Sequence, residues 1–266
     1  MTTNKPNEVL KRKTKGIKSM FAIFKKELRS YFLNAIGYVY LGVFLAVSAL
    51  LCGYTTLGSG TYDTSDYFTY ISLIFIILIP LLTMRLFAEE KKLRTEQLIL
   101  TAPVSVGGMV VGKFLAAFTL FAAGLLLSLI NFIPIFYYAN LDGVNDAYAA
   151  SMGPVVSSVL ANTLGLLLLG AAFIAVGMFI SSLTENQLAA AIITVSIIAV
   201  MLLLNVVNGY VEVYAIRFII SWVCFLSRYA PFQSGIFDPS ALLYFLSVAG
   251  IFLFLTARVY DKRRWS

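Results

Sequence analysis

The sequence contains no histidine, which excludes histidine-ligated metal sites and histidine base catalysis. Its two cysteines, Cys52 and Cys224, are too few for a disulfide framework. Charged residues are also scarce: they make up 12% of the 266 residues, against about a quarter in a soluble domain. The chain is instead 60% hydrophobic, in long runs without the alternation that a solvated face requires. The composition therefore predicts an all-α integral membrane protein.

Six apolar runs are long enough for membrane-spanning helices, since a span requires about 20 residues. The expected spans lie near residues 36–57, 67–88, 109–138, 155–181, 187–207 and 240–259. The third run is long, and Pro134 is expected to kink or end its helix. Thr184 and Gln187 fit a capping box that would open the fifth span. We treat residues 35–266 as one six-span transmembrane domain.

Two segments precede the first span. Residues 1–16 are polar and basic without periodicity, which predicts a disordered tail. Residues 17–34 place apolar side chains at helical spacing opposite cationic ones, which favours an amphipathic helix in the plane of the membrane. A soluble surface helix packed on another element is the alternative. The residues expected at the membrane interface are Phe21, Phe24, Lys25, Lys26 and Arg29.

Lysine and arginine predict the orientation, because cytoplasmic segments of membrane proteins are enriched in them. All of them except Arg217 and Arg228 lie in the N-terminal segment, around the loop of residues 89–105, or at the C-terminus. With six spans, both termini and that loop share one side, which we expect to be the cytoplasm. The basic balance then indicates contact with anionic lipid rather than nucleic acid, for which no basic and aromatic motif is present.

The connection over residues 208–239 is expected on the side opposite the cytoplasm, and its composition is unusual for a simple loop. Its apolar stretch is short and is interrupted by Glu212, Arg217 and Arg228. We expect outer-side re-entrant or interfacial helices here. A seventh span is the alternative, and it would place the C-terminus outside, which the basic ending RVYDKRRWS argues against.

The spans themselves offer no source of energy. Ion-coupled carriers and proton relays need ionisable groups at membrane depth, and the apolar runs have almost none. Gly107, Gly112 and Lys113 resemble the start of a phosphate loop, but Phe114 stands where Ser or Thr is needed. We expect Lys113 to snorkel to the cytoplasmic interface instead. No metal or cofactor site is expected, and an ATP-independent carrier or membrane-embedded enzyme is disfavoured because no carboxylate pair lies at membrane depth.

The loop EEKKLRTEQLILTAPVS, residues 89–105, carries a dense cluster of both charges between two spans. The helix of the second span is expected to continue through Arg85 to about Leu93. Thr95 would then cap a new short helix, with Glu96 in its favourable first turn.

This short helix would have an apolar side at Leu98, Ile99 and Leu100, and Pro103 would disfavour its continuation. An exposed apolar centre between polar ends suits docking into a groove of a partner protein. A solvated interfacial loop is the alternative.

The same loop resembles the cytoplasmic loop of type-2 ABC-transporter permeases. The matching residues are Thr95, Glu96, Leu98, Leu100, Thr101, Ala102, Pro103, Gly112 and Lys113. Arg94 stands where glycine is common in that family, which predicts a more helical junction. SSLTENQ also looks like the family's connection between spans four and five. SRYAPFQSGIFDPSALLYFLS is similar to the gliding-motility and nitrous-oxide-reductase-maturation branch, and the resemblance extends from about residue 19.

The resemblance implies a non-catalytic permease subunit of an ATP-driven exporter in a bacterial cytoplasmic membrane. Two permeases would pair, as a homodimer or heterodimer, and each would dock on a separate cytoplasmic ABC ATPase subunit that binds ATP and magnesium. The expected coupling residues are Glu89, Glu90, Lys91, Lys92, Arg94, Thr95, Glu96, Leu98, Leu100 and Glu185. The alternative is a mechanical role, in which the pair passes force to an extracytoplasmic partner through residues 208–239 without moving a solute.

Overall fold

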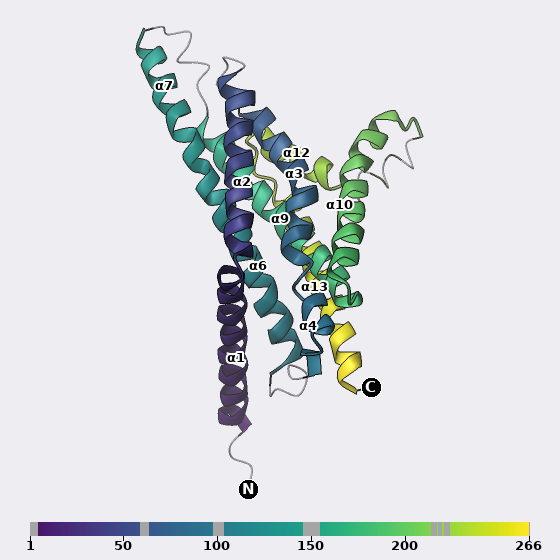
Figure 1. Cartoon of the computed structure of the whole chain (residues 1–266). Coiled ribbons are helices and arrows are strands. Elements are labelled where there is room, and N and C mark those ends of the chain that lie inside the picture. Colours follow the sequence, from purple (N-terminus) through teal and green to yellow (C-terminus); the bar gives the residue numbers. More distant parts are fainter. Residues whose placement is uncertain are drawn as a thin grey trace.

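The computed structural model describes residues 5–58, 64–97, 104–145, 155–213, 217, 220 and 224–265, and helices account for most of them (Figure 1). The elements are α1 (Lys5–Leu33), α2 (Ile36–Cys52), η1 (Gly53–Leu57), α3 (Ser65–Thr83), α4 (Ala88–Lys92), α6 (Val106–Ser128), η2 (Leu129–Asn131), α7 (Phe132–Asn145), α9 (Val156–Leu183), α10 (Gln187–Tyr210), α12 (Phe225–Gln233) and α13 (Pro239–Trp265). The described residues include no strand, in agreement with the predicted all-α class.

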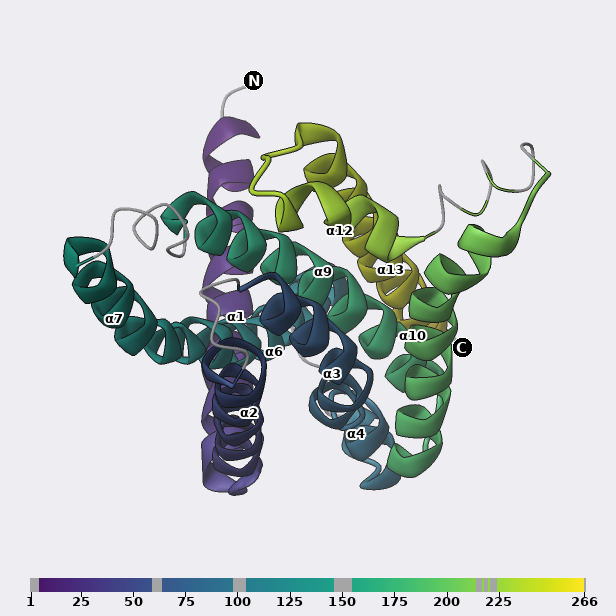
Figure 2. The ribbon, with the colours of Figure 1, turned by 90° about the horizontal axis from the view of Figure 1, so that it is seen from above.

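Six helical segments are long and apolar enough to cross a membrane, which confirms the predicted number of spans within the described part of the chain. They are Ile36–Thr56, Ser65–Lys92, Val106–Tyr138, Val156–Leu183, Gln187–Tyr210 and Pro239–Arg264. α9 is the central helix, because α3, α6, α10, α12 and α13 all contact it (Figure 2). Its most apolar stretch is 78% buried, whereas that of α10 or α13 is 22% buried. The outer helices therefore present most of their apolar surface to the surroundings, as lipid-facing helices do.

The second span is broken, although the sequence predicted a continuous helix to about Leu93. α3 ends at Thr83 and α4 begins at Ala88 after a turn. Ser181 of α9 satisfies the backbone groups that the break releases: its Oγ accepts from Phe87 N (3.1 Å) and Ala88 N (3.1 Å). The same hydroxyl donates to the carbonyl oxygen of Met84 (3.2 Å). A broken helix is tolerated in a span when a neighbouring side chain binds the freed groups in this way.

The regular α-helix of the third span is interrupted shortly before Pro134. α6 ends at Ser128, and one 3-10 turn over Leu129–Asn131 precedes α7. Pro134 has no N–H to offer the carbonyl of Ile130, and its ring crowds that carbonyl, so regular helix is disfavoured one turn earlier. The predicted effect of Pro134 is thus present, displaced by one turn.

The predicted capping box of α10 is wrong. Asn186 is the capping residue, and its Oδ1 accepts from Leu188 N (2.9 Å). Thr184 instead donates to the carbonyl of Ile180 (3.2 Å) and so belongs to the end of α9. Asn186 directly precedes α10, whereas Thr184 lies too early in the chain to reach the free N–H groups of its first turn.

α1 begins at Lys5 and therefore includes most of the segment that composition had assigned to a disordered tail. Good helix formers such as lysine, arginine and leucine dominate this segment. α1 and α2 are separated by a turn in which Ala35 has φ 57°. α1 packs along α6, and its start lies at the same end of the bundle as α4 and the end of α13 (Figure 1).

α12 is a short helix at the opposite end of the bundle (Figure 1). Side-chain hydrogen bonds fix it to three spans. Tyr229 Oη donates to Asn162 Oδ1 of α9 (2.8 Å) and Gln233 Nε2 donates to Thr69 Oγ1 of α3 (2.9 Å). Ser227 Oγ donates to Asn205 Oδ1 of α10 (3.3 Å). With nine residues α12 is too short to cross a membrane, and the described residues contain no seventh span.

Candidate coupling surface

A buried lysine lies at the point where α1, α4 and α6 meet. Lys113 of α6 is only 1% exposed, and its Nζ donates to Glu90 Oε1 (2.7 Å) and to Glu27 Oε1 (3.0 Å). It also donates to the carbonyl of Leu86 (2.7 Å) and lies 5.0 Å from the ring centroid of Phe87. The prediction that Lys113 snorkels to the interface is therefore wrong, because two carboxylates meet its charge inside the protein.

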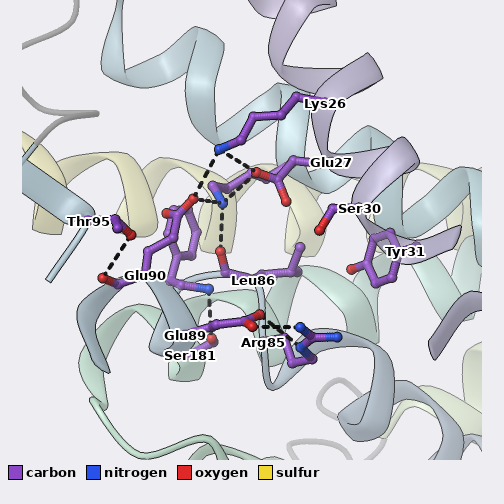
Figure 3. A network of polar contacts seen from close by, with 12 residues as sticks. Lys26, Glu27, Ser30, Tyr31, Arg85, Leu86, Glu89, Glu90, Thr95 and Ser181 are labelled. Carbon is purple, nitrogen blue, oxygen red and sulfur yellow. Dashed lines mark hydrogen bonds and ion pairs between the residues drawn. The ribbon is translucent and has the colours of Figure 1, made fainter. Parts of the chain in front are cut away.

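Close contact between α1 and α6 keeps Lys113 covered. A Cβ atom at Gly112 would lie 3.0 Å from the carbonyl oxygen of Met20, so glycine lets the two helices approach here. Lys26 of α1 completes the group from the exposed side, with its Nζ 3.7 Å from Glu27 and 3.9 Å from Glu90 (Figure 3). We call Lys26, Glu27, Glu90 and Lys113 the charge cluster. It joins three elements that are distant in the sequence.

Tyr31 provides a second link from α1 to the bundle. Its hydroxyl donates to the carbonyl of Leu82 near the end of α3 (3.1 Å). Burial raises the pKa of Tyr31 above its ordinary value, and the nearby carboxylate of Glu27 raises it further. The tyrosine therefore remains a neutral donor at physiological pH, and α1 stays attached to the helix that leads into α4.

Several predicted ATPase contacts use their charges within the chain. Glu89 accepts a two-pronged hydrogen bond from Arg85, with Nε–Oε2 at 2.8 Å and Nη2–Oε1 at 2.6 Å (Figure 3). Lys91 is buried and donates to the carbonyl of Ser182 at the end of α9. Glu90 belongs to the charge cluster. After the break, Glu90 faces α1 and α6 and Lys91 faces the end of α9, whereas Glu89 pairs with Arg85 in the turn before α4. In this structure these charges therefore position α4.

Exposed side chains are found at the last residue of α4 and at the two residues that follow it. Lys92 and Arg94 are exposed, and Leu93 is 63% exposed between them. As the exposed candidates for the predicted ATPase contact, Lys92, Leu93 and Arg94 are called the docking surface. Leu93 was missed from the sequence, although a leucine among six charged neighbours was a usable signal. A groove of about 440 Å³ beside it lies between α1 and α4, with Glu27, Glu89 and Leu93 among its walls.

α4 ends in a Schellman motif that explains the position of Arg94. The N–H of Arg94 donates to the carbonyl of Lys91 (3.0 Å), and the N–H of Thr95 donates to that of Glu90 (2.9 Å). Arg94 has φ 55°, in the left-handed region that glycine adopts most easily. The expected more helical junction is therefore wrong, and the usual glycine of related loops fits this backbone.

The hydroxyl of Thr95 donates back to the carbonyl of Glu90 (3.3 Å), so Thr95 helps to close α4. Glu96 and Gln97 directly after it are helical, as expected for the start of the predicted short helix. Glu96 is bound by Arg263 of α13, with Nη1–Oε1 at 3.1 Å. Glu185 is exposed between α9 and α10, whose facing ends both contact α4. Leu98 and Leu100 lie outside the described residues.

We expect Arg94→Gly to stabilise the protein by about 1 kcal/mol, because glycine adopts a left-handed conformation without the Cβ conflict of arginine. Lys92→Gly is the matched control: Lys92 has helical geometry, and glycine there is expected to destabilise by about 1 kcal/mol. Thermal unfolding of the detergent-purified variants measures both changes. A lower midpoint for Arg94→Gly than for the wild type would contradict the role assigned to this backbone turn.

The predicted interface residues of α1 divide between two surroundings. Phe21 is 62% exposed, and Lys25, Lys26 and Arg29 are exposed as well. Phe24 is half-buried and packs against the core, with its ring 5.8 Å from that of Phe21. The apolar face of α1 thus covers α6 on one side, while Phe21 and the cations stay exposed.

The fold and this charged end of the bundle define a multi-pass membrane protein with a rigidly attached surface element. The chain matches the family model described as ABC-2 family transporter protein over residues 53–258, and it therefore belongs to that family. The matched range contains α4, four of the six spans in full and most of the last one, Pro239–Arg264. No curated protein gives a significant match. The protein is accordingly a permease subunit of an ABC transporter, and its family implies an ATPase partner; the gliding-motility branch stays a prediction.

Proposed function

We propose that this permease subunit works in an exporter, in which a separate cytoplasmic ATPase moves the spans by pushing on α4. The observation that carries this proposal is the attachment of α4. The charge cluster joins it to α1 and α6, and Ser181 joins its first residues to the central α9. A force on the docking surface would therefore reach three helices at once.

The charge distribution supports a cytoplasmic position for this surface. The start of α1, α4 and the basic end of α13 lie together at one end of the bundle (Figure 1). Lysine and arginine at these sites favour the cytoplasmic side of a bacterial plasma membrane. In this arrangement α1 lies in the membrane interface and Lys25 and Arg29 meet lipid phosphates. Two permease chains, identical or different, would complete the transporter with two ATPase subunits.

The simplest test is co-purification of the tagged permease with an ABC ATPase, followed by an assay of ATP hydrolysis. We expect the ATPase to bind the permease and to hydrolyse ATP at a different rate in the complex than alone. Export itself is tested with the purified complex in vesicles. ATP-dependent movement of lipid or solute from the cytoplasmic side of the membrane to the other side supports it. Absence of any bound ATPase under conditions that preserve the folded permease would contradict the proposal.

We expect the double substitution Lys92→Glu and Leu93→Asp to weaken ATPase binding at least tenfold, which corresponds to about 1.4 kcal/mol. It removes an apolar anchor and reverses a charge, and both side chains are exposed, so folding should be retained. Arg217→Glu, an exposed cation far along the chain, is the control. Unchanged affinity of the double variant in a pull-down titration would remove Lys92 and Leu93 from the docking surface.

A mechanical role is the second candidate, and the attachment of α12 favours it. Hydrogen bonds from Tyr229, Gln233 and Ser227 join α12 to α9, α3 and α10, so movement of the spans would reach the outer end directly. The vesicle experiment separates the two functions. No ATP-driven movement of lipid or solute, together with tight binding of an extracytoplasmic protein, would favour the mechanical role.

A further inference from the structure

A groove on α1 is lined by three cations and, among its described walls, by no carboxylate. Arg29 lies three residues after Lys26 and four after Lys25, so the three side chains share one face of the helix, and all are exposed. The groove measures about 540 Å³, which falls within the range of about 300–1,000 Å³ that ligand sites occupy. We call it the cationic groove, and its other walls are Ala22, Ser30, Leu33 and Asn34.

The groove between α1 and α4 adjoins the cationic groove but differs from it in charge. The two grooves share three wall residues, which are Lys26, Ser30 and Asn34. The walls of the groove beside α4 carry as many carboxylates as cations, because Glu27, Glu89 and Glu90 face Lys26, Arg85 and Lys113. The excess of positive charge is therefore confined to the cationic groove, and an anion is attracted there rather than beside α4.

The polar side chains of the cationic groove can serve a ligand. Lys26 Nζ lies 3.7 Å from Glu27 and 3.9 Å from Glu90, which are ion-pair distances too long for hydrogen bonds, and its side chain is 64% exposed (Figure 3). Since such exposed pairs contribute little, Lys26 can turn toward an anion at small cost. Asn34 Nδ2 donates to Ser30 Oγ over 3.4 Å, so an amide and a hydroxyl stand beside the cations.

An apolar wall and the position in the chain indicate which anion fits. Leu33 is 71% exposed in the groove, and Asn34 comes two residues before the first span, Ile36–Thr56. An acyl chain gains from contact with an exposed leucine, whereas a free phosphate does not. We propose that the cationic groove binds one anionic phospholipid, with Lys25, Lys26 and Arg29 on the headgroup phosphate and Leu33 against an acyl chain. This site rests on the membrane contact of α1 proposed above and replaces a general attraction with a defined site.

The proposal is tested by titrating the detergent-purified, full-length permease with phosphatidylglycerol and counting bound lipids by native mass spectrometry. We expect one lipid to bind first, and phosphatidylcholine, whose headgroup has no net charge, to bind about tenfold more weakly. Lys25→Gln together with Arg29→Gln should weaken phosphatidylglycerol binding about tenfold, because each basic residue near an anionic lipid adds to the attraction. Both side chains are exposed, so folding should be retained.

A second pair of substitutions separates a defined site from a general effect of charge. Lys92→Gln together with Arg258→Gln removes the same charge from exposed cations that do not line the groove, and it should leave the affinity unchanged. Equal losses in the two double variants, or equal binding of the two lipids by the wild type, would overturn the proposed site. Equal losses with phosphatidylglycerol still preferred would leave the general membrane contact of α1 standing.

Two further measurements distinguish a lipid from a soluble phosphate. Leu33→Asn should weaken phosphatidylglycerol binding about threefold, since it removes the apolar wall and keeps every cation. Glycerol 3-phosphate, which has the phosphate without acyl chains, should not displace the lipid at equal concentration. Displacement by glycerol 3-phosphate, or full binding by Leu33→Asn, would overturn the lipid as the occupant. Failure of the permease to bind any ATPase would instead contradict the proposed coupling and leave the lipid titration standing.

Discussion

Lys113→Met is expected to destabilise the protein by about 3 kcal/mol, because it removes the buried cation of an ion pair and leaves the two carboxylates only the exposed Lys26. Here two carboxylates, those of Glu27 and Glu90, would lose their shared cation, and the carbonyl of Leu86 would lose its donor. Methionine occupies a similar volume, so the change is electrostatic rather than a loss of packing. The fraction of detergent-solubilised protein that stays monodisperse after heating measures the effect.

Two further variants make this result interpretable even if Lys113→Met fails to accumulate. Lys92→Met removes an exposed lysine and is expected to change stability by no more than about 0.5 kcal/mol. The triple variant Lys113→Met, Glu27→Gln and Glu90→Gln removes all three charges together and is expected to recover most of the loss, since no unpaired charge then remains buried. Equal stability of Lys113→Met and Lys92→Met would show that the charge cluster does not hold α1, α4 and α6 together.

Gly170→Ala is expected to cost about 1–3 kcal/mol through overpacking at the centre of the bundle. A Cβ atom at Gly170 of α9 would lie 2.2 Å from Cζ of Phe121 on α6. Phe121 is buried, and its ring contacts those of Phe75 (5.1 Å) and Phe118 (6.3 Å), so it has little freedom to move aside. The same heating assay measures the loss.

Gly250→Ala provides the matched control on a lipid-exposed helix. No atom lies within 4 Å of a Cβ built at Gly250, so alanine there is expected to be neutral or to stabilise α13 by up to about 1 kcal/mol. A reversed order, with Gly250→Ala the more damaging change, would contradict the close approach of α6 to α9.

The spans could be predicted from the sequence because length and hydropathy are local properties of a segment. The expected second span, near 67–88, and the observed apolar segment Ser65–Lys92 differ by only a few residues. The broken geometry within that span could not be predicted, since the side chain that satisfies its freed backbone groups is Ser181, more than 90 residues further along the chain. The periodicity and composition of the second span do not indicate that the hydroxyl of Ser181, on another helix, will bind its backbone.

The candidate site was predictable in place and only partly in detail. The high density of charged residues over 89–105 predicted a functional surface there, but it does not indicate which charges form ion pairs. Glu27 and Lys113 are 86 residues apart, and their contact depends on how α1 packs on α6. Lys113 was therefore expected to reach water, and Leu93 was overlooked beside its charged neighbours. The left-handed backbone conformation of Arg94 could not be predicted, because glycine is the usual sequence signal for such a turn and arginine stands here instead.

The bond between Ser181 and the break in the second span also bears on the order in which the protein is made. On a growing chain, α3 and α4 leave the ribosome well before Ser181 is translated, because Ala88 precedes it by 93 residues. Until α9 has been inserted beside them, the N–H groups of Phe87 and Ala88 lack this partner. The hydrogen bonds that hold the bend before α4 therefore form only after the fourth span has been made.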